Sequence, residues 1–139
     1  VALRGTHRGP LFEQFDDAGG WTGALSARDT ARLPMDRRTE MCGPAGTVVL
    51  IHCRVVHASA ANYSARLRPL LLNVYSAADT LPITPAPSPT KRTGVLVRGR
   101  EPLHVHMEPY EARLPPRWDQ VGYRSIFAAQ AAAHPVAVD

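Results

Sequence analysis

Residues 46–79 read G-T-V-V-L-I-H-C-R-V-V-H-A-S-A-A-N-Y-S-A-R-L-R-P-L-L-L-N-V-Y-S-A-A-D and contain the strongest strand signal of this 139-residue chain. β-Branched and apolar residues dominate 47–56, which predicts a strand with one apolar face that ends at His57. A second strand is predicted over 68–75, where Arg68 begins an apolar face. Because antiparallel neighbours lie about 4.8 Å apart, such strands would bring His57 and Arg68 to one rim of a cavity.

Shorter elements are expected on both sides of this stretch. The chain before it predicts a strand end over 1–3, a turn over 5–10, and a long loop over 21–39 with a helical turn at 26–32 that Ser26 or Asp29 caps. The chain after it predicts an extended proline-rich segment over 81–93, strands over 94–98 and 101–107, and a helix over 119–133 capped by Asp119 or Ser125.

Composition limits the class of protein. A chain of 139 residues is expected to be a single domain, 1–139, and its net charge of +4 comes from basic residues scattered through the sequence. No basic run interleaves with aromatic residues, so we expect no nucleic-acid partner. Cys42 and Cys53 form no C-x-x-C motif, and Cys53 is expected to be a small buried hydrophobe. Without an apolar run of about eighteen residues or a signal peptide, we expect no membrane partner and a cytoplasmic location.

Four segments together resemble a known family. They are G-T-H-R-G (5–9), A-G-T-V-V-L-I-H (45–52), H-A-S-A-A-N-Y-S-A-R-L-R (57–68) and N-V-Y-S-A-A-D (73–79). This set resembles the C-terminal half of the phytanoyl-CoA dioxygenase family, which includes ectoine hydroxylase-like enzymes. The resemblance implies an all-β fold with minor helix, a double-stranded β-helix of the jelly-roll or cupin type without its N-terminal part.

The resemblance also implies roles for three residues. His57 matches the distal iron-binding histidine, and Arg68 matches the arginine that pairs with the far carboxylate of 2-oxoglutarate. Ser59 matches a hydroxyl that contacts the same carboxylate. These residue types suit the chemistry, because neutral imidazole is a good ligand for Fe(II) and the planar guanidinium binds carboxylate in a bidentate manner. No catalytic residue is expected beyond this metal site.

The sequence departs from the family pattern in one respect. The family needs an H-x-D pair before the Gly-Thr-His-Arg turn, and the chain begins at that turn. Its H-x-acid triplet, His106-Met107-Glu108, lies after His57 and is in the wrong order. Three explanations are open: the pair lies in a missing N-terminal segment, another chain completes the barrel, or the protein is a non-catalytic binding or structural module.

Taken together, these features predict that the protein is an enzyme. We expect an Fe(II)- and 2-oxoglutarate-dependent dioxygenase that hydroxylates a small organic substrate, with Fe(II) as cofactor and 2-oxoglutarate as cosubstrate. The loops over 15–39 and 81–93 are where specificity would reside, because variable loops commonly carry it.

Overall fold

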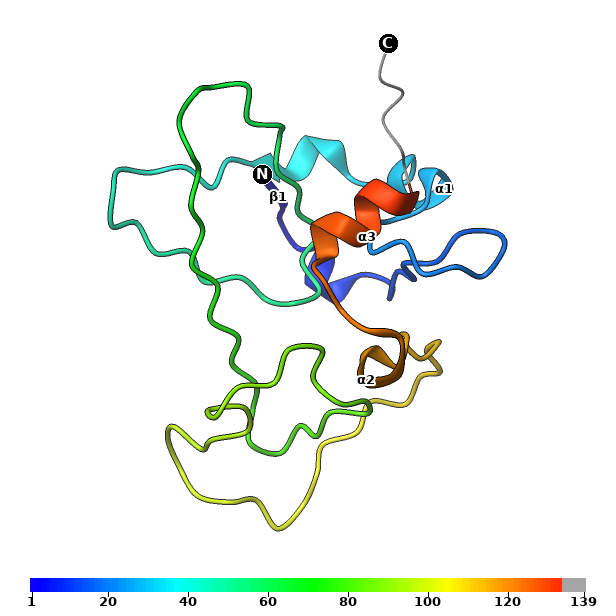
Figure 1. The fold of residues 1–139 in the computed structure, drawn as a ribbon, viewed down its shortest axis with the longest axis vertical. Helices are drawn as coiled ribbons and strands as arrows, with labels where there is room; N and C mark the ends of the chain where they lie inside the picture. The colour runs from blue at the N-terminus through cyan, green and yellow to red at the C-terminus, as the bar shows by residue number, and fades with distance from the viewer. Residues whose placement is uncertain (134–139) are drawn as a thin grey trace. The chain divides into compact units, whose positions relative to one another are not determined.

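The computed structural model describes residues 1–133, which fall into two units. Unit 1 comprises Val1–Phe12 and Leu25–Leu71, and unit 2 comprises Glu13–Ala24 and Leu72–Asp139. The elements follow one another as β1 (Ala2–Leu3), η1 (Thr6–Arg8), α1 (Ala27–Thr30), η2 (Met35–Arg37), β2 (Arg38–Thr39), α2 (Trp118–Val121) and α3 (Ile126–Ala133) (Figure 1).

Unit 1 is built around β1, which lies between two partners. On one side β1 pairs antiparallel with β2, with Ala2 opposite Thr39 and Leu3 opposite Arg38. On the other side Ala2 forms an antiparallel bridge with His57. Ala2 and Leu3 are the buried apolar residues of this part of the chain, so β1 forms the centre of the small core. The expected strand at the start of the chain is therefore confirmed.

Helix α1 begins where the sequence predicted a capped turn. The Ser26 hydroxyl accepts a hydrogen bond from the backbone N–H of Asp29 at 3.1 Å, and its own O–H donates to the Asp29 carboxylate at 3.0 Å. This arrangement satisfies a backbone donor that the first turn of a helix would otherwise leave unpaired. The helix ends after one turn, and β2, which sequence reasoning did not anticipate, follows a short 3-10 turn.

Unit 2 is held together by aromatic side chains. An isolated bridge joins Phe15 to Trp21, and the Trp21 ring makes an edge-to-face contact with Trp118 at 4.9 Å between centroids. Trp118 in turn contacts Tyr123 edge-to-face at 5.3 Å. Edge-to-face geometry is favourable because the positive ring edge meets the negative ring face. These ring contacts therefore join the hairpin-like segment to α2 and to the residues just after it.

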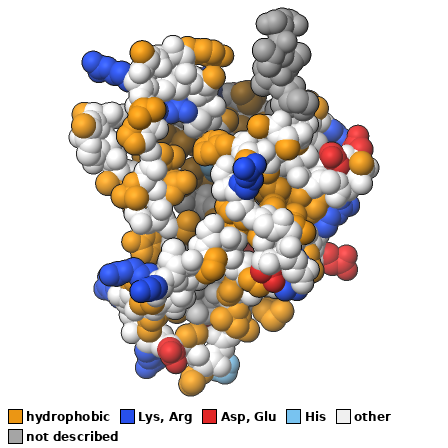
Figure 2. Space-filling model, viewed as in Figure 1, with side chains coloured by type: hydrophobic (Ala, Val, Ile, Leu, Met, Phe, Trp, Pro, Cys, Tyr) orange, Lys and Arg blue, Asp and Glu red, His pale blue; other side chains and the backbone are white. Residues whose placement is uncertain are grey.

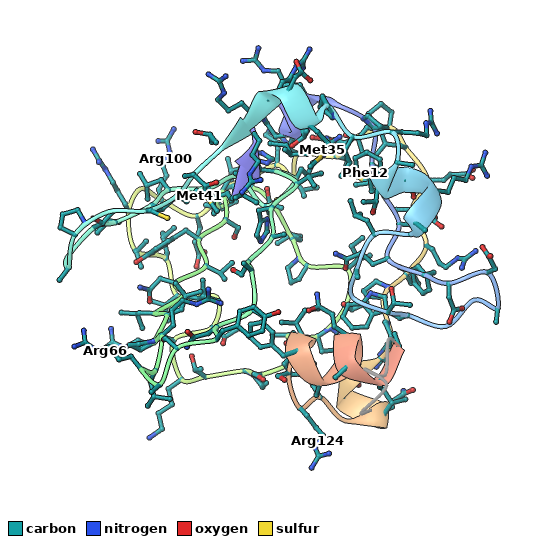
Figure 3. All side chains as sticks on the ribbon, turned by 90° about the horizontal axis from the view of Figure 1, so that it is seen from above. Phe12, Met35, Met41, Arg66, Arg100 and Arg124 are labelled. Atoms are coloured by element: carbon teal, nitrogen blue, oxygen red, sulfur yellow. The ribbon has the colours of Figure 1, made fainter. Side chains whose placement is uncertain are left out.

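The helix expected over 119–133 is present but interrupted. Gly122, with φ of 81°, ends α2 after four residues, and α3 begins only at Ile126. The Gln130 side chain of α3 donates to the Gly23 carbonyl oxygen at 2.8 Å, which anchors this helix to the hairpin-like segment. Arg124, between the two helices, points away from α3 (Figure 3).

The expected double-stranded β-helix is wrong. The predicted strands over 47–56, 68–75, 94–98 and 101–107 are not strands within the described residues, and the one regular sheet there consists of β1 and β2. β-Branched residues favour strands mainly through packing against cross-strand neighbours, so a strong sequence pattern does not produce a sheet without pairing segments.

The consequence of unpaired segments is exposed apolar surface. Val48 and Leu50 are 81% and 95% exposed, and Leu71 is 85% exposed. Hydrophobic side chains are spread over the visible face of the molecule (Figure 2). Cys53, expected to be buried, is also exposed, so that prediction was wrong. No helix within residues 1–133 has the length and apolar character of a membrane span.

Candidate metal-ligand and carboxylate site

The backbone around His57 is fixed by hydrogen bonds to β1. The Leu3 N–H donates to the Val56 carbonyl oxygen at 2.9 Å, and the Ala58 N–H donates to the Val1 carbonyl oxygen at 3.1 Å. Together with the bridge between Ala2 and His57, these bonds form a short antiparallel ladder. Of the strand expected over 47–56, only Val56 takes part in this ladder, through its carbonyl oxygen.

Thr6 ties the turn after β1 to the same segment. Its hydroxyl donates to the Leu3 carbonyl oxygen at 2.8 Å and accepts from the Val56 N–H at 2.9 Å. Thr6 is only 7% exposed, so both bonds form away from water. Sequence reasoning treated this threonine as part of a turn and missed its role as the link to the His57 segment. No local sequence signal marked it, because its partner Val56 lies fifty residues further along the chain.

The His57 ring has a defined orientation. Its Nδ1 atom lies 2.8 Å from the Val55 carbonyl oxygen. Because a carbonyl oxygen can only accept, Nδ1 is the donor in this bond, and Nε2 is the ring nitrogen left for a metal ion. Metal-binding histidines commonly show this arrangement, with one ring nitrogen donating to a backbone carbonyl. The side chain is exposed, so Nε2 is accessible to a metal ion.

The loop after His57 folds back on itself. The Arg68 guanidinium donates to the Ala60 carbonyl oxygen at 3.1 Å, and the Asn62 amide donates to the Arg66 carbonyl oxygen at 2.7 Å. The Ser64 hydroxyl donates to the Asn62 side-chain oxygen at 2.7 Å, which closes the loop further. Arg68 therefore contacts Ala60 through this loop, and not through pairing of two strands.

The remaining predicted positions are less organised. Ser59 is exposed on the loop just before Ala60, and Arg68 is also exposed. His106 and Glu108 are exposed too. Across residues 1–133, no three histidine, cysteine, aspartate or glutamate side chains gather closely enough to hold a metal ion. Among the predicted site residues, His57 has an oriented ring, and its role and those of Ser59 and Arg68 stay predictions.

The two units differ in charge. Unit 1 contains nine arginines, no lysine and three carboxylates, giving it a net charge of +6. Unit 2 contains seven basic and nine acidic residues, giving −2. Within unit 1, Arg38 is paired with Glu40 at 2.8 Å, and the Arg54 guanidinium donates to the Gly9 carbonyl oxygen at 2.8 Å. The positive field of the chain is therefore concentrated on the unit that carries His57.

The chain is similar to a known family and to a known protein. A family model described as phytanoyl-CoA dioxygenase matches residues 1–70. The chain is 31% identical over 135 residues to a protein of Stutzerimonas stutzeri named "Probable alpha-ketoglutarate-dependent hypophosphite dioxygenase". That match covers 95% of this chain and 46% of the relative, so the chain spans about half the length of the curated relative. No solved structure gives a significant match.

Proposed function

Because the chain belongs to the phytanoyl-CoA dioxygenase family, we propose that it forms part of an Fe(II)- and 2-oxoglutarate-dependent dioxygenase acting on a small molecule. In this proposal His57 is an iron ligand, while Arg68 and Ser59 bind the far carboxylate of 2-oxoglutarate. The observation that carries it is the hydrogen bond from His57 Nδ1 to the Val55 carbonyl oxygen at 2.8 Å, which leaves Nε2 to face a metal ion.

The residues present suit the cofactor as a partial site. Imidazole is a normal ligand for non-haem Fe(II), but one histidine is too few to hold the metal in a facial triad. The other ligands would come from outside residues 1–133, in a missing N-terminal segment or another chain. When bound, the iron would activate dioxygen for substrate oxidation coupled to decarboxylation of 2-oxoglutarate.

The protein's own contribution is orientation. The Val55 carbonyl holds the imidazole in one tautomer, so no proton has to move before Nε2 binds a metal. The β1 ladder and Thr6 fix the backbone that carries the ring. Arg68 would exchange its bond to the Ala60 carbonyl for a stronger charge-assisted pair with the cosubstrate carboxylate.

The substrate proposed here is a small anion. The name of the Stutzerimonas relative specifies hypophosphite, a phosphorus oxyanion, and the net charge of +6 on unit 1 would attract an anion of this kind. The small organic substrate expected from the sequence stays a prediction. An organic acid would fit that prediction and would also be attracted by the positive charge of unit 1. Recognition of either depends on the same chemistry, a carboxylate or oxyanion facing guanidinium groups.

The alternative proposal is a non-catalytic binding module. It is favoured by the absence of a three-ligand metal cluster within residues 1–133. The two proposals differ in whether the complete protein binds metal and cosubstrate together.

The deciding experiment is titration of the complete protein with Mn(II), a spectroscopically visible substitute for Fe(II), followed by 2-oxoglutarate. We expect one Mn(II) and one 2-oxoglutarate per protein. His57→Ala should weaken metal affinity at least roughly 100-fold, because even second-shell changes cost about 10- to 100-fold. His104→Ala, which changes another exposed histidine, is the matched control and should leave metal affinity unchanged. If the unaltered protein binds neither Mn(II) nor 2-oxoglutarate, the proposal of a non-catalytic binding module holds instead.

Arg68→Ala separates cosubstrate binding from folding. Loss of a charge-assisted hydrogen bond is expected to weaken 2-oxoglutarate binding by roughly 10- to 100-fold, with metal affinity nearly unchanged. The measurement is the pair of dissociation constants obtained in the same titration. Equal loss of both affinities would mean that Arg68 acts only by closing its loop onto Ala60.

A further inference from the structure

Two histidine rings meet where η1 contacts a later segment of unit 1. The His7 ring of η1 lies 5.4 Å from the His52 ring between centroids, and the two ring planes are 41° apart. A second contact joins the same segments, because the Arg54 guanidinium donates to the Gly9 carbonyl oxygen at 2.8 Å. His52 therefore lies in a joint between two distant parts of the chain.

The His52 side chain closes the turn that begins with it. The Val55 N–H donates to the His52 carbonyl oxygen at 2.9 Å, which forms a four-residue turn. Within this turn, the Arg54 N–H donates to the Nδ1 atom of His52 at 3.1 Å. A backbone N–H can only donate, so Nδ1 accepts this bond and can do so only while it carries no proton.

The same turn leads directly into the candidate metal ligand. Val55, its last residue, supplies the carbonyl oxygen that lies 2.8 Å from His57 Nδ1. The next residue, Val56, donates from its N–H to the buried Thr6 hydroxyl at 2.9 Å. Opening of the turn would therefore move the acceptor that orients the His57 ring.

The titratable and charged groups around His52 are His7, Cys53 and Arg54. His7 faces it from η1, and the other two belong to its own turn, with the Cys53 sulfur 4.0 Å from Nδ1. No carboxylate forms an ion pair with either histidine among residues 1–133. The His52 ring is exposed, so protons reach it from water. A proton on Nδ1 would displace the Arg54 N–H and would bring no compensating ion pair.

We propose that His52 is a positioning residue for His57 and acts only while its Nδ1 atom is unprotonated. Once Nδ1 binds a proton, the turn loosens and the Val55 carbonyl no longer holds the His57 ring. The open turn binds more protons than the closed turn, so a falling pH favours the open turn. Histidine ordinarily changes charge between about pH 5 and pH 8, and we expect the change in this window. The consequence for metal binding rests on the proposed function, whereas the closing of the turn does not.

The test uses the complete protein without metal or 2-oxoglutarate, so that its outcome is independent of cofactor binding. Hydrogen exchange of the Arg54 and Val56 amides is measured at about pH 8 and about pH 5, each relative to an unstructured peptide at the same pH. We expect the protection of both amides to fall roughly 2- to 10-fold at the lower pH, which is the range for loss of one hydrogen bond. Unchanged protection of both amides would overturn the inference.

Variants then assign the pH dependence to one ring. His52→Asn keeps an acceptor for the N–H two residues on and cannot titrate, so it should protect both amides equally at both pH values. His52→Ala removes the acceptor and should lower the protection at both. His104→Asn, which changes an exposed histidine of unit 2, is the matched control and should keep the pH dependence. His57 remains in every variant, so a pH dependence that survives His52→Asn would overturn the inference.

A second measurement needs no variant. Slow hydrogen exchange at the Leu3 amide reports an intact ladder, and if His52→Asn loses it, NMR titration of the unaltered protein provides the test. The Arg54 amide proton should titrate together with the His52 ring protons, because the two groups share one hydrogen bond. An Arg54 amide that ignores the titration of the His52 ring would overturn the inference.

Metal binding keeps this inference distinct from the proposed function. At about pH 5, His52→Asn should bind Mn(II) roughly 2- to 10-fold more tightly than the unaltered protein. If the amides depend on His52 while no metal binds, this inference stands and the dioxygenase proposal fails. If metal and 2-oxoglutarate bind while the amides ignore His52, the proposed function stands and this inference fails.

Discussion

The two units of the chain are stabilised by different interactions. Unit 1 is organised by backbone hydrogen bonds to β1 and by the buried Thr6 hydroxyl, and it contains only two aromatic residues, Phe12 and Tyr63. Unit 2 contains both tryptophans and is organised by edge-to-face contacts around Trp118. The candidate site lies in unit 1, where backbone hydrogen bonds position His57 without a large core.

This difference has a practical consequence. The family model covers residues 1–70, which include all but one residue of unit 1. Because the two units rely on different interactions, disturbing the aromatic contacts should change the fluorescence and stability of unit 2 while the His57 ladder persists. Disturbing Thr6 should loosen the His57 ladder and leave the fluorescence and stability of unit 2 unchanged. The following changes are ordered from the largest expected effect to the smallest.

Gly23→Ala should produce the largest loss of stability, and it should be confined to unit 2. A Cβ at this position would lie 2.5 Å from the Ile126 Cδ1 atom and 2.9 Å from a Trp21 ring carbon, and the φ of +67° is unfavourable for alanine. We expect a loss of roughly 2–4 kcal/mol in the free energy of unfolding, combining overpacking with left-handed strain. Tryptophan fluorescence during urea denaturation measures it, because both tryptophans report on this unit.

Gly122→Ala is the matched control for that change. It has a similar φ of +81° but nothing within 4 Å of its Cβ position, so only the backbone cost of about 1–2 kcal/mol should remain. If the two variants lose equal stability, packing of α3 against Gly23 contributes nothing.

Thr6→Val should loosen unit 1 and leave unit 2 unchanged. The substitution keeps the shape of the side chain, removes the bond to the Leu3 carbonyl and leaves the Val56 N–H without its acceptor. A cost of about 1–3 kcal/mol is expected for the unpaired buried group. Faster hydrogen exchange at the Val56 amide is the measurement, with the exposed Thr30→Val as the control. Unchanged exchange would mean that the β1 ladder holds His57 without Thr6.

The smallest effect concerns Asp119 at the start of α2. Side-chain hydrogen bonds from Arg117, at 3.0 and 2.7 Å, hold the pKa of the Asp119 carboxyl below its usual range. A lowered folded pKa means that the associated stability is present above the unfolded pKa and is lost as the pH falls through the folded pKa. Because both side chains are exposed to water, this contribution should be too small to detect in unfolding experiments.

The pKa itself is measurable by NMR titration of the Asp119 carboxyl. Arg117→Gln should raise it toward the ordinary aspartate range, and high salt should raise it in the unaltered protein. A titration curve unaffected by Arg117→Gln would show that the hydrogen bonds do not persist in solution. Comparison with Gly23→Ala then separates surface electrostatics from packing within unit 2.

Local features of the fold could be predicted from the sequence, whereas the pairing of distant segments could not. The Ser26 cap of α1 was predictable because it involves residues three apart, and the C-terminal helical region was predictable from composition. The strand over 47–56 was mispredicted because its apolar alternation describes a surface that needs neighbours, and alternation does not reveal whether they exist. β2 was missed because a strand of two residues is too short to show an alternation of apolar and polar residues.

The sequence by itself determined the family, through the spacing of His57, Ser59 and Arg68 after the Gly-Thr-His-Arg turn. Only the tertiary structure decided how His57 is held, because the ladder to Ala2 and the buried Thr6 bond join positions about fifty residues apart. It also decided that β1 pairs with β2 on its other side, since strand register depends on which segments pair. Motif spacing and local geometry can be read along the chain. Pairing between distant segments depends on the free energy of the whole folded structure.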